Sequence, residues 1–389
     1  MRRRFVVITE IIAPYRIPVF NALAKFGDID LHVVFLSETD TSLRQWSVYR
    51  DEIQFSYEVL PAWRTRVGGH NFLMNRGLGH ALSKCDPDVI VCGGYNYVAS
   101  WQALVWAKWR RVPFVLWTES TGRDQRRAFP PVEIAKQLFI RRCDGFLVPG
   151  KAALKYVVSL GVSADRIFVA PNAVDVRRFA LAAERAKNDA AAIRQKWQLP
   201  ARFFLFVGRQ VAAKGIFDLL EAYSQLSREV RRELGLVYVG DGAGRAELEE
   251  RAKAASDDTI RVIGFTQRDD LAKFYALAEA LVLPTHSDTW ALVVNEAMAC
   301  GLPVITTNVA GCVEDLVHHN ENGFVVAAQD ANGLTHALNR FAADTELVRR
   351  MGRRSVELIS NYSPEKCAAG FASIRFAIVP GAANWKPVA

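Results

Sequence analysis

Hydrophobic residues in the first 180 positions fall into short continuous runs, separated by stretches with helical spacing. Runs such as FVVIT, LHVVF, VIVCG and FVLW are rich in β-branched residues. Continuous apolar runs that alternate with helices are typical of parallel strands buried on both faces. The pattern therefore predicts a doubly wound α/β domain over residues 1–178.

The alternation pauses at an Ala- and charge-rich stretch before residue 200, which predicts a helical connection or the first helix of a new unit. It restarts at FFLFVG and continues through LVYVGDG, RVIGF, ALVLPT, PVITTN and GFVVAA. The restart predicts a second doubly wound domain over residues 200–361, with a tail of about 362–389 that packs back on the first domain. Because ligands of such sheets bind at the carboxyl ends of the strands, we expect the active site in a cleft between the two domains.

Charge is distributed unevenly along the chain. Residues 1–180 hold 25 Lys and Arg against 16 Asp and Glu, whereas residues 181–389 hold 24 against 25. A basic first half suits an anionic membrane surface, a phosphorylated substrate or nucleic acid. A generically basic surface is the competing interpretation.

The cysteines and the hydropathy of the chain both favour a cytoplasmic location. The six cysteines form no CxxC pair, which favours reduced, buried thiols in a cytosolic protein. No apolar run reaches the length of a membrane-spanning helix, and the N-terminal run is too short for a signal peptide. We expect a cytoplasmic protein that is able to make peripheral contact with a membrane.

A pair of cations follows the first strand of the predicted second domain. That strand ends at Gly208, and the loop after it supplies Arg209 and Lys214 before a helix begins. Cations beside the free N–H groups of a helix N-terminus suit a diphosphate. Solvated loop charges are the alternative interpretation.

Glycines follow the next strand at Gly240, Gly242 and Gly244. Their G-x-G-x-G spacing differs from the G-x-G-x-x-G dinucleotide fingerprint, so it is weak evidence for NAD or FAD. It predicts a tight turn that brings the backbone close to a ligand or a helix. The strand after it ends near Ile263 to Phe265, where a nucleobase would lie against the backbone.

Two carboxylates lie in the stretch SDTWALVVNEAMACGLPVI. Asp288 falls in a predicted loop, where it or Thr289 is placed to cap a helix from about Trp290. Glu296 lies near the middle of that helix among apolar residues, where a carboxylate is costly without a partner. A ribose diol is one such partner; a buried Arg, and a plain capping role for Asp288, are the structural alternatives.

Polar residues also follow strands of the first domain. Tyr15 and Arg16 lie in the first strand-to-helix loop, and Glu119 and Arg123 follow the strand FVLW. These positions place them at the carboxyl edge of the predicted sheet. Ligand contacts and solvated loop charges are equally compatible with the pattern.

Taken together, these motifs resemble the retaining family 4 glycosyltransferases of the GT-B fold, and the resemblance spans nearly the whole chain. It is carried by the segments VGRQVAAKG, VGDGAGRAELE, VIGFTQRDDLAKFYALAEALVLPT and EAMACGLPVI. The E-x7-E signature of that family falls on Asp288 and Glu296, with Asp at the first position. The resemblance implies two Rossmann-like domains that face one another across a cleft, with the acceptor bound by the first and the nucleotide sugar by the second.

The resemblance also implies roles for individual residues. Arg209 and Lys214 would meet the diphosphate, Asp288 would lie beneath the transferred sugar, and Glu296 would hold the ribose hydroxyls. Further donor contacts are implied at Gly208, Gly240, Ile263, Phe265, Thr289, Trp290, Ala291 and Leu292. The acceptor-side candidates are Tyr15, Arg16, Glu119 and Arg123, although APYRIP replaces the Gly-rich first loop of the family and Thr118–Glu119 stand where a His is frequent.

The implied activity is transfer of a hexosyl-type sugar from a nucleotide diphosphate to an acceptor hydroxyl, with retention, in cell-surface polysaccharide, glycolipid or related glycoconjugate synthesis. The chain lacks an Asp-x-Asp motif, so we expect neither a metal nor another cofactor. The expected partners are an acceptor sugar or lipid-linked glycan and the anionic inner face of the cell membrane, not nucleic acid. The competing hypotheses are a nucleotide-sugar epimerase of the same fold, transfer to a small soluble acceptor, an NAD-dependent oxidoreductase, and a non-catalytic binding scaffold.

Overall fold

The computed structural model describes residues 2–40, 45–67, 70–122, 130–254 and 258–377. The chain divides into two compact units. Unit 1 comprises Met1–Ala173 together with the chain from Pro364 on, and unit 2 comprises Val174–Ser363. The predicted Arg123 site lies outside the described residues.

The boundary between the units falls earlier than the predicted end of the first domain at residue 178. Asp175 accepts a hydrogen bond from the backbone of Arg178 and caps α6 (Val176–Asn188). This helix packs along α11 (Arg268–Leu277) of unit 2. A side-chain cap at Asp175 therefore starts the first helix of unit 2 before residue 178.

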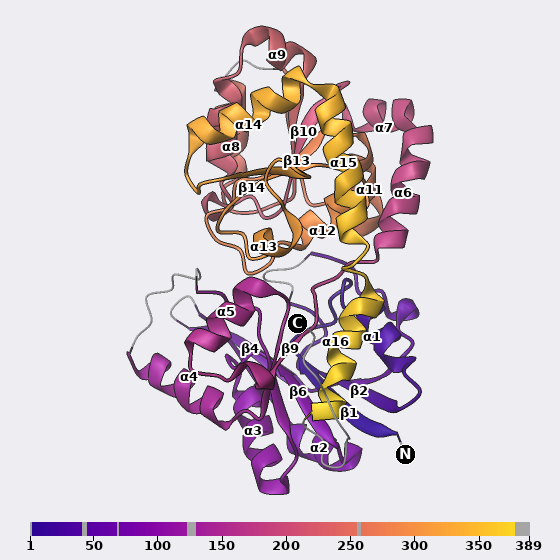
Figure 1. Ribbon diagram of the computed structural model, residues 1–389, viewed down its shortest axis with the longest axis vertical. Coiled ribbons are helices and arrows are strands. Elements are labelled where there is room, and N and C mark those ends of the chain that lie inside the picture. The colour runs from indigo at the N-terminus through magenta and orange to yellow at the C-terminus, as the bar shows by residue number, and fades with distance from the viewer. Residues whose placement is uncertain (1, 41–44, 68–69, 123–129, 255–257, 378–389) are drawn as a thin grey trace. The chain divides into compact units, whose positions relative to one another are not determined.

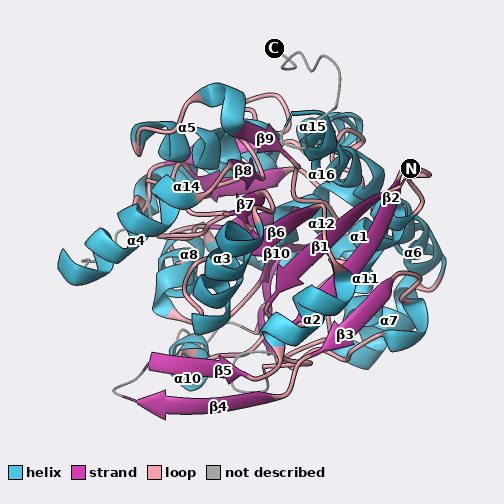
Figure 2. Ribbon diagram, turned by 90° about the horizontal axis from the view of Figure 1, so that it is seen from below, coloured by secondary structure: helices cyan, strands magenta, loops and turns pink. Residues whose placement is uncertain are grey.

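Unit 1 is built on a seven-stranded parallel sheet of order β3-β2-β1-β6-β7-β8-β9. Strands β1, β2, β6 and β9 are labelled in Figure 1, and all seven in Figure 2. The strands are β1 (Arg3–Thr9), β2 (Ile29–Phe35), β3 (Ser56–Val59), β6 (Val89–Gly93), β7 (Phe114–Trp117), β8 (Gly145–Val148) and β9 (Ile167–Val169). The helices are α1 (Ile17–Ala24), α2 (Leu78–Cys85), α3 (Val98–Arg110), α4 (Pro130–Arg142), α5 (Lys151–Ser159) and α16 (Pro364–Ala377).

Alternating side chains of each central strand serve two separate cores. In β1, Val6 and Ile8 contribute to a core covered by α2, α3, α4 and α5. Phe5 and Val7 contribute to the core on the opposite face, which α1 and α16 cover. This period of two explains why the strand reads as a continuous apolar run.

Helix α16 returns to unit 1 after the whole of unit 2. It packs against α1 and β9, and Phe371 is fully buried there. The Phe371 ring makes edge contacts with Trp117 at 5.1 Å and Phe20 at 6.1 Å between centroids. The chain after unit 2 therefore supplies part of the core of unit 1.

A hairpin of β4 (Ala62–Val67) and β5 (His70–Asn75) stands apart from the main sheet (Figure 2). Leu73 points inward and joins the core beneath α3. Arg64 pairs with Asp40 at 2.7 Å and with Glu10 at 3.3 Å. This hairpin was not predicted, although a Gly-Gly pair such as Gly68–Gly69 is one of the residue pairs that favour a hairpin turn.

Unit 2 is built on a six-stranded parallel sheet of order β12-β11-β10-β13-β14-β15. The strands are β10 (Phe203–Val207), β11 (Gly235–Val239), β12 (Ile260–Ile263), β13 (Ala280–Leu283), β14 (Val304–Thr307) and β15 (Gly323–Val326). The further helices are α7 (Ala190–Trp197), α8 (Ile216–Ser224), α9 (Arg228–Glu233), α10 (Arg245–Ala254), α12 (Leu292–Ala299), α13 (Val313–Leu316), α14 (Ala331–Ala343) and α15 (Thr345–Ile359).

The order of strands in unit 2 reverses between β10 and β13. The chain runs outward from β10 to β12 on one side and then crosses to β13 on the other. Loops at the carboxyl ends of two such strands leave in opposite directions, which creates the usual ligand position of open α/β sheets. The predicted donor residues Gly208, Arg209 and Lys214 follow β10, and Asp288 follows β13.

The helices of both units are short. The longest in the described part of the chain include α15, with 15 residues, and α16, with 14. Within the described ranges, no helix combines the length and the apolarity that crossing a bilayer requires.

Candidate active site

The loops after β10 and β13 touch one another. Gly215 has a left-handed backbone with φ of 70°, and a Cβ at this position would lie 2.0 Å from the carbonyl oxygen of Pro284. The backbone N–H of His286 donates to the carbonyl of Ala213 at 3.0 Å. Only glycine permits so close an approach, and it brings Lys214 alongside the second loop.

Lys214 and Asp288 form an ion pair at this contact. Lys214 Nζ lies 2.5 Å from Asp288 Oδ2 and 3.2 Å from the carbonyl oxygen of Ser287. The two side chains are 13% and 19% exposed, so their mutual attraction is stronger than it would be in bulk water. The fold thus joins two predicted catalytic residues that are 74 positions apart in the sequence.

Asp288 shapes the loop and does not cap the helix. Its Oδ1 accepts a hydrogen bond from the backbone N–H of Trp290 at 3.2 Å. The prediction of a helix from Trp290 capped by Asp288 or Thr289 is wrong, because α12 begins at Leu292. The indole of Trp290 is buried and donates to Asn295 Oδ1 at 2.9 Å, so this side chain belongs to the core.

The start of α12 has no side-chain cap. Ala291 precedes the helix with φ of 76° and ψ of 70°. This left-handed conformation costs a residue with a Cβ about 1–2 kcal/mol, and such strain concentrates at functional sites. The N–H of Val294 donates to the carbonyl of Ala291 at 3.0 Å, so the N–H groups of Leu292 and Val293 are those placed to receive an anion.

Glu296 lies in the second turn of α12 and meets a tyrosine. The hydroxyl of Tyr275, on α11, donates to Glu296 Oε2 at 2.8 Å. Tyr275 is fully buried, whereas Glu296 is partly exposed. Tyr275, rather than the buried Arg considered in the sequence analysis, therefore holds one oxygen of this carboxylate.

Burial raises the pKa of Glu296 to about 7, while the Tyr275 hydroxyl and the positive charge of Arg268 act in the opposite direction. Burial, and then the charge of Glu296, raise the pKa of Tyr275 well above its ordinary value. Tyr275 therefore remains a hydrogen-bond donor at every physiological pH. Glu296 exchanges its proton close to neutrality and accepts hydroxyl donors best when it is ionised.

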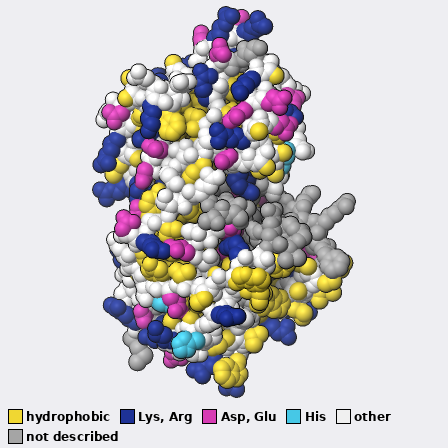
Figure 3. Space-filling model, turned by 180° about the vertical axis from the view of Figure 1, so that it is seen from behind, with side chains coloured by type: hydrophobic (Ala, Val, Ile, Leu, Met, Phe, Trp, Pro, Cys, Tyr) yellow, Lys and Arg dark blue, Asp and Glu magenta, His cyan; other side chains and the backbone are white. Residues whose placement is uncertain are grey.

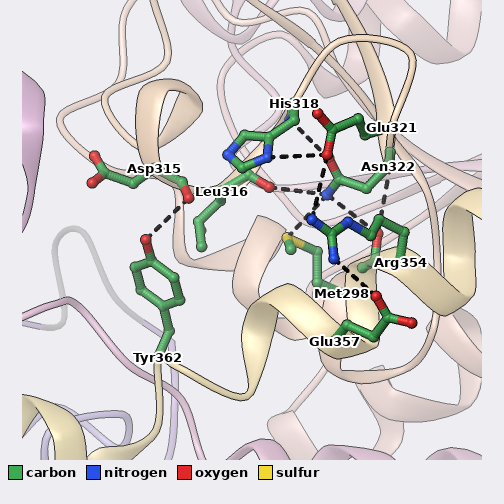
Figure 4. A network of polar contacts seen from close by, with 10 residues as sticks. Met298, Asp315, Leu316, His318, Glu321, Asn322, Arg354, Glu357 and Tyr362 are labelled. Carbon is green, nitrogen blue, oxygen red and sulfur yellow. Dashed lines mark hydrogen bonds and ion pairs between the residues drawn. The ribbon is translucent and has the colours of Figure 1, made fainter.

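A polar network supports α12 from behind (Figure 4). The buried side chain of Asn322 donates to the carbonyl of Leu316 at 2.9 Å and lies 4.0 Å from Met298 Sδ on α12. On the solvent side of this network, Arg354 of α15 forms ion pairs with Glu321 and Glu357. Met298 is the residue through which this network contacts α12, the helix that carries Glu296.

The glycines predicted to form a tight turn lie where the loops after β10 and β11 meet. A Cβ at Gly240 would lie 2.0 Å from the carbonyl oxygen of Gly208. The backbone N–H of Gly240 donates to the carbonyl of Ile263 at 3.1 Å, which ties in the end of β12. Phe265 is 38% exposed just beyond, and Arg209 is exposed beside Gly208.

Residues that the sequence analysis missed brace the same loops. His286 Nε2 lies 2.6 Å from Asp218 Oδ2 on α8, and the buried hydroxyl of Thr285 donates to the carbonyl of Ser287 at 2.9 Å. No spacing in the sequence marks these contacts. The contact between His286 and Asp218 arises because β10 and β13 are neighbours in the sheet, whereas the bond from Thr285 to Ser287 is local to one loop.

We expect Tyr275→Phe to weaken nucleotide-sugar binding about tenfold at neutral pH. The variant removes a hydrogen bond to a charged group, worth about 1.5–3 kcal/mol, and the pKa of Glu296 then rises further. Titration calorimetry at pH 6.5 and 8.5 measures the effect, which should be larger at the lower pH. Tyr238→Phe, which removes the 3.0 Å bond to the carbonyl of Ile216, is the matched control. Equal affinities of Tyr275→Phe and wild type at both pH values would contradict the role of Tyr275.

The acceptor-side candidates of unit 1 gather at the carboxyl edge of its sheet. Arg16 is buried, donates to Asn172 Oδ1 at 3.0 Å and pairs with Glu119. Its guanidinium lies 4.0 Å from the centroid of the Trp117 ring and 5.2 Å from that of Tyr15. Arg16 therefore organises three strand ends, those of β1, β7 and β9, while Glu119 keeps part of its carboxylate exposed.

One side-chain group could hold a metal ion among the described residues. Ligand atoms of His32, Glu58 and Cys85 lie within 4.8 Å of one another. His32 Nδ1 lies 2.8 Å from Ser56 Oγ, and Nε2 lies 3.7 Å from Glu58 Oε1. The bond to Ser56 therefore orients the ring, whereas His32 Nε2 and Glu58 Oε1 are buried without a hydrogen-bond partner among the described residues. This group belongs to unit 1 and not to the unit that carries Asp288.

Comparison with known protein families finds two matches, one within unit 1 and the start of unit 2 and one within unit 2. Residues 20–178 match Glycosyltransferase Family 4, and residues 189–357 match Glycosyl transferases group 1. The chain is 29% identical over 249 residues to the D-inositol 3-phosphate glycosyltransferase of Xylanimonas cellulosilytica, a match that spans 60% of the chain and 58% of that relative. It is 24% identical over 364 residues to the glycogen synthase of Mycobacterium tuberculosis, which spans 90% and 84%.

Solved structures share the fold at low sequence identity. An Anabaena protein, HepE, in complex with UDP and glucose superposes with a TM-score of 0.73 at 17% identity, covering 95% of the chain and 98% of that structure. A glycosyltransferase from Rickettsia africae superposes with a TM-score of 0.75 at 14% identity, covering 98% and 99%. Both likenesses establish the two-domain GT-B architecture.

Proposed function

Because the chain belongs to the family 4 glycosyltransferases, we propose that it transfers a sugar from a nucleotide-diphosphate donor to an acceptor hydroxyl with retention of the anomeric configuration. The sugar is of hexosyl type, and the product is a cell-surface polysaccharide, glycolipid or related glycoconjugate. The observation that carries the proposal is the Lys214–Asp288 ion pair. Asp288 belongs to the loop that leads to the start of α12, which has no side-chain cap.

Lys214 and Arg209 would stabilise the leaving diphosphate. An ammonium group has three N–H donors, and the oxygens of Asp288 and Ser287 engage two of those on Lys214. The third is left for a phosphate oxygen, and exposed Arg209 supplies a second cation. The free N–H groups at the start of α12 add their dipole. Charge that develops on the departing phosphate is thereby met without a resident metal.

Glu296 would hold the other end of the nucleotide. Tyr275 occupies Oε2, and Oε1 has no hydrogen-bond partner among the described residues. A ribose diol can therefore donate to Oε1 without displacing a protein contact. Phe265 offers a partly exposed ring near the base, and the backbone at Ile263 offers a polar edge.

Asp288 would act on the sugar through its charge. As the bond from the anomeric carbon to the phosphate oxygen breaks, its electron pair leaves with the diphosphate and the carbon becomes positive. A carboxylate beneath the ring favours that state. The acceptor oxygen attacks from the same face and its proton passes to the departing phosphate oxygen, so the configuration is retained.

The acceptor would bind to unit 1, near Glu119 and Arg16. We propose an acceptor sugar or lipid-linked glycan, together with peripheral association of unit 1 with the anionic inner face of the cell membrane. The excess of basic residues in positions 1–180 supports both. Glu119 neutralises buried Arg16 through one carboxylate oxygen. The exposed part of the same carboxylate would then be available to accept a hydrogen bond from a sugar hydroxyl.

A thermal-shift panel of nucleotide sugars tests the donor site. We expect one class among UDP, GDP and ADP sugars to raise the melting temperature, because only a donor that binds the native state stabilises it. UDP-glucose is the first candidate, because the Anabaena neighbour was also solved with that compound. A panel in which no nucleotide sugar shifts the melting of unit 2 would contradict the donor site.

Product analysis without acceptor separates transfer from epimerisation. A transferase leaves the sugar of the stabilising donor unchanged, apart from slow hydrolysis, until an acceptor is added. An epimerase converts that sugar with no acceptor present. Rapid conversion in the absence of acceptor would overturn the proposed reaction while leaving the donor site intact.

A further inference from the structure

Exposed hydrophobic side chains are concentrated in unit 1. Fifteen large hydrophobic side chains are exposed among the described residues, and twelve of them belong to unit 1. Scattered exposure on a surface is ordinary, whereas a concentration on one part indicates an interaction surface. Figure 3 shows hydrophobic side chains gathered with Lys and Arg on one side of this unit.

Helix α3 presents an apolar stripe to solvent. Val98, Val105 and Trp109 are separated by seven and four positions, which places them on one face of the helix. Trp109 is 76% exposed and Val105 is 67% exposed. The opposite face, with Ala103 and Ala107, is buried against the sheet. The helix is therefore apolar on both sides, although only one side is covered by protein.

Helix α4 also presents apolar side chains to solvent. Ile134, which is 60% exposed, and Leu138 lie four positions apart on its outer side, while Phe139 is buried beneath. Phe139 packs edge-on against Trp101 of α3, with ring centroids 4.9 Å apart. The two helices therefore lie in one layer over the same core. We name the outer side chains Val98, Val105, Trp109, Ile134 and Leu138 the α3–α4 face.

Positive charge surrounds the α3–α4 face. Residues 98–111 and 130–142 contain six Lys and Arg and one acid, Glu133. Glu133 pairs with Lys136 at 2.8 Å, and two acids outside these helices, Asp144 and Asp86, lie 2.8 Å from Lys108 and 3.8 Å from Arg110. Arg110 and Arg111 end α3, and Arg141 and Arg142 end α4, all four exposed. Two copies that met through this face would oppose like charges, so the charge favours an anionic occupant over a second copy.

We propose that the α3–α4 face docks on an anionic bilayer. A tryptophan suits the headgroup boundary, and aliphatic side chains insert just below it. Arginines at the helix ends reach lipid phosphates while their stems remain in apolar surroundings. This inference rests on the proposed peripheral association and assigns it to named residues.

Vesicle co-sedimentation of the full chain tests the assignment. The vesicles are phosphatidylcholine with and without phosphatidylglycerol, and no nucleotide sugar is needed. We expect wild type to bind only the anionic vesicles, less tightly as salt rises from 0.1 M to 0.5 M. V105E/W109E should lower partitioning at least tenfold. R110Q/R141Q should lower it severalfold and flatten the salt dependence.

Unit 2 provides matched controls. Val356→Glu changes an exposed valine on α15, and R349Q/R353Q removes two exposed arginines from the same helix. Both should bind vesicles as wild type does. Melting temperature and the shift caused by a nucleotide sugar should remain unchanged in all these variants, which shows that each is folded.

The outcomes distinguish membrane association itself from its assignment to the α3–α4 face. Wild type that fails to bind anionic vesicles overturns membrane association itself, without affecting the donor site. Wild type that binds while both α3–α4 variants bind equally well overturns the assignment to this face. Variants that bind vesicles normally but change the mass measured by light scattering would show a second copy on the face, which also overturns it.

Discussion

Lys214→Ala is expected to slow sugar transfer about 100- to 1,000-fold at saturating donor, the usual loss when one preorganised charge partner of a transition state is removed. In the proposed mechanism this ammonium group stabilises two charges at once, the carboxylate of Asp288, which it contacts in the structure, and the leaving diphosphate. Asp288→Asn should cost a similar factor, because it removes the field beneath the sugar and releases Lys214 from its 2.5 Å contact. Steady-state kinetics with the donor found by thermal shift measures both.

The double variant distinguishes this coupled pair from two independent residues. We expect K214A/D288N to be about as slow as either single variant, because each single change already breaks the ion pair. K273A/D270N, which removes another Lys–Asp pair of unit 2, should transfer sugar at the wild-type rate. Multiplicative losses in the double variant would show that the two residues act separately.

Glu296→Gln is expected to stabilise unit 2 in a pH-dependent manner. The pKa of Glu296 rises from 4.5 to about 7 on folding, so between these values the native state binds more protons than the unfolded state. The stabilisation is therefore complete below pH 4.5 and is lost as pH rises through 7. This rise in pKa predicts that the free energy of unfolding of the variant, relative to that of wild type, increases by about 2–3 kcal/mol between pH 5 and pH 8.

Urea titrations at these two pH values measure the gain, using the transition that the nucleotide sugar displaces. That ligand identifies the unfolding of unit 2, since two units need not unfold together. Because Glu296 loses its proton as pH rises through 7, we also expect wild type to bind a nucleotide sugar more tightly over this range. Glu296→Gln should show no such rise in affinity. A stability difference that is equal at both pH values would mean that Glu296 does not titrate in this range.

Much of the fold follows from local patterns. The strands predicted as continuous apolar runs are confirmed, because burial on both faces leaves few polar positions in them. Gly208, Lys214 and Asp288 were predicted at strand ends, and strand ends are set by the same runs. Topology then explains why Lys214 and Asp288 meet, since β10 and β13 are adjacent at the switch point.

The contacts between helices could not be predicted in the same way. Tyr275 reads as a core aromatic of α11, and nothing in its spacing indicates that its hydroxyl meets Glu296 on α12. The start of α12 was misplaced by two residues because Ala291 adopts a left-handed conformation that its residue type disfavours. The pairing of Arg16 with Glu119 depends likewise on the packing of three loops.

The return of α16 to unit 1 has a consequence for the order of events during synthesis. Unit 2 is contiguous in sequence, so it can complete its core as soon as Ser363 has left the ribosome. Unit 1 is translated first, yet Phe371 and Ile374 reach its core only after the whole of unit 2 has been made. Unit 1 therefore waits, with one face of its sheet incompletely covered, until unit 2 is finished.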